Sequence, residues 1–511
     1  MINEAVFLSI IFLSGCIFTC VFLWDKHAPY TLGFIIGSAM QIVTGTFLFI
    51  TGYPVSPIVN VLLVFLVSVA CLIFRNKFSR FLKINIFKVL LFMLLSVFII
   101  SIVVYSLFYE GWVKNTNDSI GLISTMQTIA RSGGLALNLR DIVSILVGPA
   151  LLHLPATVAG ELYFRAVFPL LSISVVLALM WFVYRGCFGR VKTRKLLVMV
   201  ILSGLLLISN NRYVFHSFYV HAHLVCAAMA LTVSACGWLM MHDKKEHQNG
   251  YLAIMSVALF ALIVSRPESV LIGFMALIPL ISTKIMISIR QKQVLLYAFG
   301  IPTVVYYGFV IYSQGSGILT MINTPGYYGM SNLTPILYCL LGILVICLSF
   351  LLSTLYKHKL FSYLSGRATV IAECGLWVFL LYYFITETEL FRLNVISVYE
   401  NFIIGEGAWG FSVVFLTLLA MLVLLFVKNP NSMTALRFPV TTFMPVMMIT
   451  SYLAGARHMT GPFGSMNRMF IQIVPLAILF IVMSAALGEL KFIRRIDSDK
   501  VSEIEDDKPR N

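Results

Sequence analysis

The charged residues that could do chemistry in this chain stand in loops between long apolar segments. Asp118, followed by Ser119, opens a short apolar-periodic stretch in the longest of these loops. A carboxylate at a helix start can act as a general base toward a hydroxyl group, or it can cap the helix by accepting backbone amide hydrogens. The two roles can coexist, so Asp118 is our first candidate for a catalytic base. Glu110, at the end of the preceding apolar segment, is the substitute candidate.

Arginine and histidine gather in the sequence NNRYVFHSFYVHAH, which starts at residue 210 and contains Arg212, His216, His221 and His223. The three histidines do not share one face of a helix, because 221 and 223 point in different directions. A metal site is therefore the less favoured alternative. We expect Arg212, His216 and His221 to bind a substrate or to hydrogen-bond a neighbouring helix.

A third candidate is the turn formed by Ser265, Arg266, Pro267 and Glu268, which stands between two apolar segments. Ionisable side chains at that depth are costly, so each needs a partner or a ligand. One alternative is that Arg266 and Glu268 pair with each other. The other is that Arg266 binds a phosphate while Glu268 orients it or contacts a sugar hydroxyl.

The fourth candidate flanks a glycine-rich turn, GPFGS at 461–465, ahead of the last apolar segment. Arg457 and His458 precede the turn, and Arg468 follows it. Two arginines, a histidine and flexible backbone form a plausible cradle for an anion. The pattern is short, so its meaning depends on what the fold brings beside it.

The elements that position these residues must be membrane-spanning helices. Of the 511 residues, 60% are hydrophobic and 11% are charged, against about 25% charged in a typical soluble domain. Apolar runs near twenty residues long match a helix that crosses a hydrocarbon core of about 30 Å. Barrel strands would show short alternating segments instead. The first segment lacks a preceding basic cluster and a cleavage pattern, so we expect it to be a retained span rather than a signal peptide.

We therefore predict an all-α polytopic membrane protein with about 13 to 15 transmembrane helices and short interfacial helices on the outer face. The candidate spans are 5–24, 31–52, 56–74, 86–109, 162–184, 196–210, 217–241, 251–265, 268–283, 294–313, 334–355, 368–385, 409–427, 438–454 and 469–488.

The loops separate into two sets by their basic residues. One set holds all but nine of the 36 lysines and arginines, and by the positive-inside rule it is cytoplasmic. It comprises residue 26, the loops 75–88, 185–195, 242–247, 284–292, 357–367 and 428–437, and the tail from 491.

In the other set, eight of the nine basic residues are arginine, and only Lys114 is lysine. A planar guanidinium grips phosphate with two hydrogen bonds, whereas lysine would serve equally well as a topological charge. The bias therefore suggests anion binding on the outer face. The alternative is that these arginines pair with carboxylates of the same loops.

The longest outer loop, 110–160, has two parts. The stretch from Asp118 to Gly134 predicts an amphipathic helix in the membrane interface, with Ile120, Ile123, Met126 and Ile129 on its apolar side. The stretch 142–159 is apolar but broken by prolines. We expect it to be re-entrant or interfacial, with a full span as the alternative.

Other classes of chemistry lack a signature. The chain has no P-loop and no dinucleotide-binding glycine pattern, and its cytoplasmic loops are too short to build either domain. The net charge of +15 is distributed as a membrane protein requires, so we expect no nucleic acid partner. The nine cysteines show no pairing or ligand spacing. We assign no metal ligand and leave open whether a divalent metal assists.

At these residues the chain resembles the membrane glycosyltransferases of the GT-C fold, which take a sugar from a polyprenyl-phosphate carrier. The likeness rests on Asp118 at the head of an interfacial helix, the turn of Arg266, Pro267 and Glu268, and Arg468 ahead of the final span. The resemblance implies a catalytic bundle over 86–490 that includes the loop 110–160. N-terminal helices over 1–85 would precede it, and a charged cytoplasmic tail over 491–511 would follow.

The resemblance also implies an inverting sugar transfer on the outer face of a bacterial cytoplasmic membrane. Asp118 would deprotonate or orient the acceptor hydroxyl, and the arginines would stabilise the phosphate that leaves. Three extra spans precede the long loop, and no large soluble domain follows the bundle. These departures favour enzymes that move a hexose such as glucose onto a surface polysaccharide or glycolipid, as in the modification of lipopolysaccharide O-antigen.

Two rival functions remain. A polysaccharide polymerase or ligase also acts on polyprenyl-linked sugars, but such proteins concentrate their arginines and histidines in one large outer loop. A transporter or flippase of lipid-linked sugars would need charged or helix-breaking residues at mid-membrane in several spans. This chain keeps nearly all its polar residues at one rim, which favours chemistry at the surface over passage.

Overall fold

The computed structural model describes residues 2–23, 25–77, 117–137, 147–283, 286–313, 334–429, 431–462 and 464–491. These residues form an all-α polytopic membrane protein. Nine of the described helices are long and apolar enough to cross a membrane. They are α1 (Ile2–Phe22), α2 (Ala28–Phe49), α3 (Pro57–Phe74), α10 (Val167–Cys187), α13 (His223–His242), α14 (Lys245–Ser265), α16 (Ile289–Ser313), α18 (Thr334–Leu355) and α20 (Ala368–Thr386).

Shorter elements complete the described bundle. Its remaining long segments are α11 (Thr193–Ile208), α15 (Pro267–Ser282), α22 (Ser412–Phe426), α23 (Thr434–Ala454) and α25 (Val474–Leu487). Short helices at the ends are α6 (Asn117–Ser132), α8 (Val147–His153), α9 (Ala156–Ala159), α12 (Asn211–His216), α19 (Lys359–Ser365), α21 (Thr388–Tyr399) and α24 (Ser465–Phe470). A two-residue antiparallel pair joins β1 (Val427–Lys428) to β2 (Glu489–Leu490).

The predicted spans coincide with helices wherever the structure describes them. The differences are a few residues at the ends, as with 217–241 against His223–His242 for α13. The predicted span 86–109 lies outside the described residues, so the number of crossings stays a prediction.

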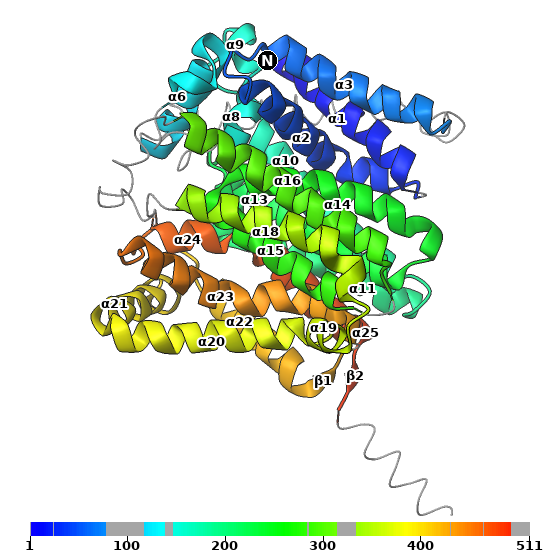
Figure 1. Cartoon of the computed structure of the whole chain (residues 1–511), viewed down its shortest axis with the longest axis vertical. Helices are drawn as coiled ribbons and strands as arrows, with labels where there is room; N and C mark the ends of the chain where they lie inside the picture. Colours follow the sequence, from blue (N-terminus) through cyan, green and yellow to red (C-terminus); the bar gives the residue numbers. More distant parts are fainter. Residues whose placement is uncertain are drawn as a thin grey trace, which may run out of the picture.

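The helices pack side by side in layers (Figure 1). Every residue of α13 except the last, His242, is buried, so this helix forms the centre of the bundle. Close packing of α1 on α2 depends on small residues, as is typical of helices in lipid. A Cβ on Gly15 would lie 1.9 Å from the carbonyl oxygen of Gly33.

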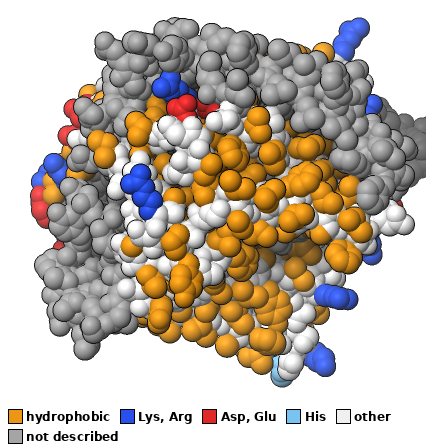
Figure 2. All heavy atoms as spheres, turned by 90° about the horizontal axis from the view of Figure 1, so that it is seen from above, with side chains coloured by type: hydrophobic (Ala, Val, Ile, Leu, Met, Phe, Trp, Pro, Cys, Tyr) orange, Lys and Arg blue, Asp and Glu red, His pale blue; other side chains and the backbone are white. Residues whose placement is uncertain are grey.

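The outward face of α3 exposes Ile58, Leu62 and other large apolar side chains. Figure 2 shows a broad hydrophobic surface on one face of the molecule.

The two ends of the bundle differ as the two sets of loops predict. We call the end that bears the lysine-rich loops the basic rim and the other end the opposite rim. At the basic rim, Arg185 contacts Asp243 at 2.7 Å, and Arg190 donates to the carbonyl of His242 at 2.7 Å. In Figure 1, α19, β1 and β2 lie toward this end, whereas α6, α21 and α24 lie toward the other. The four candidate motifs therefore share the opposite rim.

The structure confirms the predicted amphipathic helix as α6, but the face that is buried differs from the predicted one. Leu122, Met126 and Ile129 are fully buried together with Ser119, whereas Ile120 is 49% exposed. The helix ends where Gly133 adopts φ +82°, and a Cβ there would lie 2.3 Å from the carbonyl oxygen of Gly52. Glycine is thus required for the turn that packs α6 against the loop after α2.

The described part of the proline-broken stretch, 147–159, is buried within the bundle up to Ala156. All seven residues of α8 are buried, and the chain breaks at Leu154 and Pro155 before the single turn of α9. Seven helical residues rise only about 10 Å, too little to cross the hydrocarbon core. Of the predicted alternatives, the described part of this stretch fits a re-entrant segment rather than a full span.

Candidate functional site

The opposite rim brings three of the four candidate motifs into one cluster. It is built from α12 and the loop that follows, the start of α13, the turn between α14 and α15, and the segment from Pro462 through α24 to Gln472. We call this the rim cluster. It consists of Arg212, His216, His221, His223, Arg266, Glu268, Arg468 and Gln472.

Local capping holds α12 in place beneath this cluster. The side chain of Asn210 accepts a hydrogen bond from the backbone N–H of Tyr213 at 3.0 Å, as an N-cap residue does. The buried phenol of Tyr213 donates to the carbonyl of Ser172 in α10 at 2.7 Å. The short helix is therefore fixed at both its start and its inner face, which gives Arg212 and His216 defined positions.

Arg266 and Glu268 form an ion pair, so the pairing alternative of the sequence analysis is realised. Arg266 stands in extended backbone at the N-cap of α15, and Pro267 follows at the first helical position. Glu268 is only 7% exposed, and it also accepts a hydrogen bond from Gln472 Nε2 at 3.1 Å. The carboxylate is thus satisfied by two donors inside the bundle.

His223 links this pair to Gln472, in the turn between α24 and α25. Gln472 Nε2 faces His223 Nδ1 at 2.9 Å as well as Glu268. Because an amide nitrogen only donates, Nδ1 accepts, and the neutral ring carries its proton on Nε2. That atom in turn faces Arg266 Nη1 at 3.4 Å. In this tautomer both atoms are donors, so an acceptor atom placed beside them, within hydrogen-bond distance of each, would satisfy both.

Arg212 is a buried cation beside a second one. Its side chain is 2% exposed, donates to the carbonyl oxygen of Pro462, and lies over the Phe215 ring with the guanidinium carbon 4.9 Å from the centroid. Burial, followed by the positive charge of Arg468, lowers the pKa of Arg212 to about 10. The group stays charged at neutral pH, so its low-dielectric position favours a bound anion.

His216 is held as a neutral acceptor next to these cations. Its Nδ1 lies 2.8 Å from the carbonyl oxygen of Arg212, which fixes the proton on Nδ1. Burial, followed by the charge of Arg212, lowers the pKa of His216 well below its usual value. Among the described residues, no hydrogen-bond partner reaches the buried Nε2. This lone pair can accept a hydrogen bond from a substrate hydroxyl.

Aromatic rings connect the two halves of the cluster. The rings of His221 and His223 are stacked with centroids 4.2 Å apart and 10° between their planes. The ring of Tyr219 also stacks on His221, with centroids 5.3 Å apart, and the rings of His216 and His223 meet edge to face at 5.9 Å. The column fixes the imidazoles relative to one another, so the cluster is pre-organised rather than assembled by a ligand.

The remaining predicted residues of the glycine-rich segment have a different position. The ring of His458 contacts the Met447 carbonyl at 2.9 Å through Nε2 and Ser465 Oγ at 3.1 Å through Nδ1. Both ring nitrogens are thus used to hold the loop, and burial lowers the pKa of His458. Arg457 is exposed. The structure therefore gives His458 a framework position and leaves Arg457 outside the rim cluster.

The predicted bases are only partly described. Asp118 is the second residue of α6, and its side chain lies outside the described part, as does the whole of Glu110. The neighbouring Ser119 is buried and donates to the carbonyl of Val220 at 3.2 Å. The first turn of α6 therefore packs against the loop that carries His221, which brings the backbone of Asp118 to the rim cluster.

Gln472 is the residue that sequence reasoning missed, and His223 was left out of the substrate-binding set. A glutamine inside a predicted apolar span is a signal of its own, because a buried amide requires partners. His223 is the first residue of α13, whereas His216 ends α12 and His221 lies in the loop between them. Helical spacing in the sequence therefore could not show that the three side chains lie together.

The cluster is suited to an anion rather than to a metal. In the described parts of the chain, no group of three histidine, cysteine, aspartate or glutamate side chains is arranged to hold a metal ion. The rim cluster instead offers hydrogen-bond donors and the positive charge of Arg212, Arg266 and Arg468, next to neutral imidazoles. No protein-family model, curated protein or solved structure matches this chain.

Proposed function

We propose that this chain is a membrane glycosyltransferase that moves a hexose from a polyprenyl-phosphate carrier to a surface polysaccharide or glycolipid. The opposite rim is then the outer face of the cytoplasmic membrane of a bacterium. To the resemblance to the GT-C glycosyltransferases, we add the rim cluster as the site that binds the phosphate of the donor.

The observation that carries the proposal is the pair of neighbouring arginines, Arg212 and Arg468. The hydrogen bond of Arg212 goes to a neutral carbonyl, while the nearby charge on it is another cation. Two guanidinium groups held close together at one rim create a positive field that attracts negative charge. The phosphate of a polyprenyl-phosphate sugar would supply that charge at the membrane surface.

The same groups suit the reaction. As the glycosidic bond breaks, negative charge grows on the departing phosphate, and fixed guanidinium groups stabilise it without reorganisation. An oxygen of that phosphate, placed beside Arg266 and His223, would also satisfy the donors of both. His216 Nε2 would accept a hydrogen bond from a sugar hydroxyl, and Asp118 would take the proton of the acceptor hydroxyl.

The test measures sugar transfer in membranes supplied with labelled polyprenyl-phosphate hexose and acceptor. Arg212→Gln and Arg468→Gln should each lower kcat/KM by about 10²-fold or more, the usual cost of removing one donor to a developing anion. Arg457→Gln is the matched control and should keep wild-type activity, because Arg457 is exposed and outside the cluster.

Two results would overturn the proposal. One is wild-type transfer by both arginine variants in membranes that contain normal amounts of folded protein. The other is a wild-type protein that moves the labelled lipid across the bilayer but transfers no sugar, which would support the transporter alternative.

A further inference from the structure

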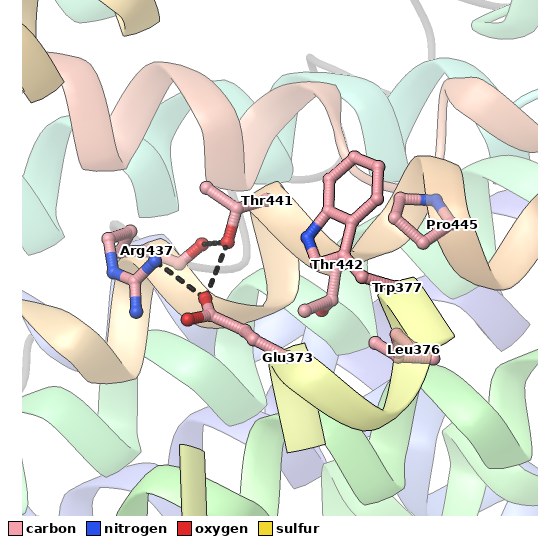
Figure 3. Close-up of a pocket in the computed structure, with 7 residues that line it drawn as sticks. All are labelled: Glu373, Leu376, Trp377, Arg437, Thr441, Thr442 and Pro445. Carbon is pink, nitrogen blue, oxygen red and sulfur yellow. Dashed lines mark hydrogen bonds and ion pairs between the residues drawn. The ribbon is translucent and has the colours of Figure 1, made fainter. Parts of the chain in front are cut away.

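A cavity at the basic rim holds charged side chains that the proposed reaction does not use. It lies between α20 and α23 and has a volume of about 200 Å³. Figure 3 shows Arg437, Glu373 and Thr441 at one end of the cavity and Trp377 and Pro445 at the other.

At the polar end of the cavity, the side chains of Arg437 and Glu373 have hydrogen-bonding groups that can still bind a ligand. Arg437 Nη1 donates to Glu373 Oε1 at 2.6 Å, and Thr441 Oγ1 donates to the same oxygen at 3.3 Å. Both bonds end on Oε1, so within the described residues Oε2 can still accept a donor from a ligand. A guanidinium has five N–H donors, and this contact uses one of them. The pair can therefore bind one anionic and one cationic group at the same time.

The cavity opens toward the lipid-facing surface of α20. The side chains of Arg437 and Glu373 are 28% and 23% exposed, while Trp377, Val378 and Leu381 are all more than half exposed on the same helix. A charged pair beside such an apolar face is costly in a bilayer, and such residues mark ligand sites. A lipid headgroup can reach the pair while its acyl chains lie against these apolar side chains of α20.

The depth of the pair fits the headgroup layer of the leaflet at the basic rim. Arg437 lies in the first turn of α23, and Glu373 is five residues after Ala368, the first residue of α20. Five residues correspond to a rise of about 7.5 Å. The acyl chains of a lipid bound here would run along the apolar side chains of α20.

We propose that this cavity binds the headgroup of a zwitterionic aminophospholipid, with its phosphate on Arg437 and its ammonium on Glu373. The volume is below the roughly 300–1,000 Å³ of pockets that enclose drug-sized ligands, which suits a small headgroup whose chains stay outside. Trp377 follows Glu373 by four residues on α20 and also lines the cavity, so its ring can contact an ammonium group held by Glu373. This site is separate from the rim cluster and does not depend on sugar transfer.

The pair also predicts which lipids are rejected. A phosphatidylglycerol headgroup carries a net negative charge and no cation, so it offers Glu373 Oε2 only neutral hydroxyl donors and repels the carboxylate. A choline headgroup keeps the positive charge, but its quaternary nitrogen has no N–H to donate to Glu373 Oε2. The expected order of affinity is phosphatidylethanolamine, then phosphatidylcholine, then phosphatidylglycerol.

The test is native mass spectrometry of the full-length protein, released from nanodiscs that contain equal amounts of the three lipids. The wild type should retain phosphatidylethanolamine about tenfold over phosphatidylglycerol. Arg437→Gln and Glu373→Gln should each abolish this preference. Arg392→Gln is the matched control and should preserve it, because Arg392 pairs with Glu389 in an exposed position at the opposite rim.

A purely structural pair is distinguished by a third variant. Trp377→Leu leaves the ion pair intact and removes a side chain that is 65% exposed, so folding should be unaffected. Under the proposal, the preference for phosphatidylethanolamine over phosphatidylglycerol falls at least threefold in this variant. That result supports the proposal even if the charge variants do not fold. Equal retention of all three lipids by the wild type, or an unchanged preference in Trp377→Leu and the folded charge variants, would overturn the proposal.

Discussion

Ser119, in the first turn of α6, donates from its hydroxyl to the backbone carbonyl of Val220 at 3.2 Å, although 101 positions separate the two residues. Ser119 is fully buried, so this contact belongs to the packed interior and not to a loose loop. It joins α6, in the loop predicted to be outside, to the segment that carries the histidines. The consequence is that Asp118 and Arg468 belong to the same end of the bundle, as a shared site requires.

Asp118→Asn should reduce sugar transfer by at least about 10²-fold, because an amide cannot accept the proton of the acceptor hydroxyl. The measurement is the rate of transfer from labelled polyprenyl-phosphate sugar in membranes. Ser119→Ala is the neighbouring control: it removes one hydrogen bond, worth about 0.5–1.5 kcal/mol of stability, and leaves the carboxylate. Full activity of Asp118→Asn would remove this residue from the role of base and leave Glu110 as the candidate.

The titration of His216 should appear as a loss of stability in mild acid. Its folded-state pKa is lowered well below the value of about 6.5 in the unfolded chain. Below pH 6.5 the unfolded state therefore binds more protons, so the free energy of unfolding rises with pH up to that value and falls below it. His458 contributes in the same direction, because burial also lowers its pKa.

Thermal unfolding in detergent measures this effect. The melting temperature of the wild type should fall between pH 7 and pH 5, and His216→Gln should show a shallower fall over the same range. Lys359→Gln, at the exposed basic rim, should keep the wild-type slope. A slope that is identical in wild type and His216→Gln would show that this imidazole is not held neutral in the folded protein.

Gly133→Ala should destabilise the protein more than Gly160→Ala, although both glycines have positive φ angles. At Gly160, with φ 73° and ψ 18°, alanine costs about 1–2 kcal/mol for the left-handed region, whereas Gly133, with φ 82° and ψ −179°, lies in a region that essentially only glycine adopts. Only at Gly133 would the new Cβ also meet backbone, 2.3 Å from the Gly52 carbonyl, whereas nothing lies within 4 Å at Gly160. We expect the Gly133 variant to melt several degrees lower than the Gly160 variant, and equal melting temperatures would contradict the packing of α6.

The fold was predictable from sequence because its determinants are local. Apolar length sets each span, and Ser132 with Gly133 and Gly134 marks the end of α6 where the structure ends it. The buried face of α6 was less predictable. The side chain of Ile120 points outward while Leu122 is buried, because the helix is rotated by its packing on α8 and the loop after α2. Such a rotation depends on partners that are far away in sequence.

The site was predictable in its residue types but not in its partners. Arg266 and Glu268 are adjacent enough in sequence for their pairing to be foreseen. The contacts of Gln472 with His223 and Glu268 span more than two hundred residues, and no local pattern encodes them. His458 is a second example: a histidine beside an arginine suggested an anion site, and the contacts of its two ring nitrogens with Met447 in α23 and Ser465 in α24 could not be foreseen from that pattern.

The two rims should respond oppositely to an impermeant thiol reagent applied to intact cells. Arg457 and Lys359 are both exposed, and they lie at the opposite rim and the basic rim. A cysteine in place of Arg457 should react from outside, whereas one in place of Lys359 should react only after the membrane is permeabilised. The wild-type protein is the background control, because Cys347 and Cys374 are exposed on α18 and α20. Labelling of both positions from outside would place the basic loops on the exterior, and the outer-face location of Arg212 and Arg468 would fail with them.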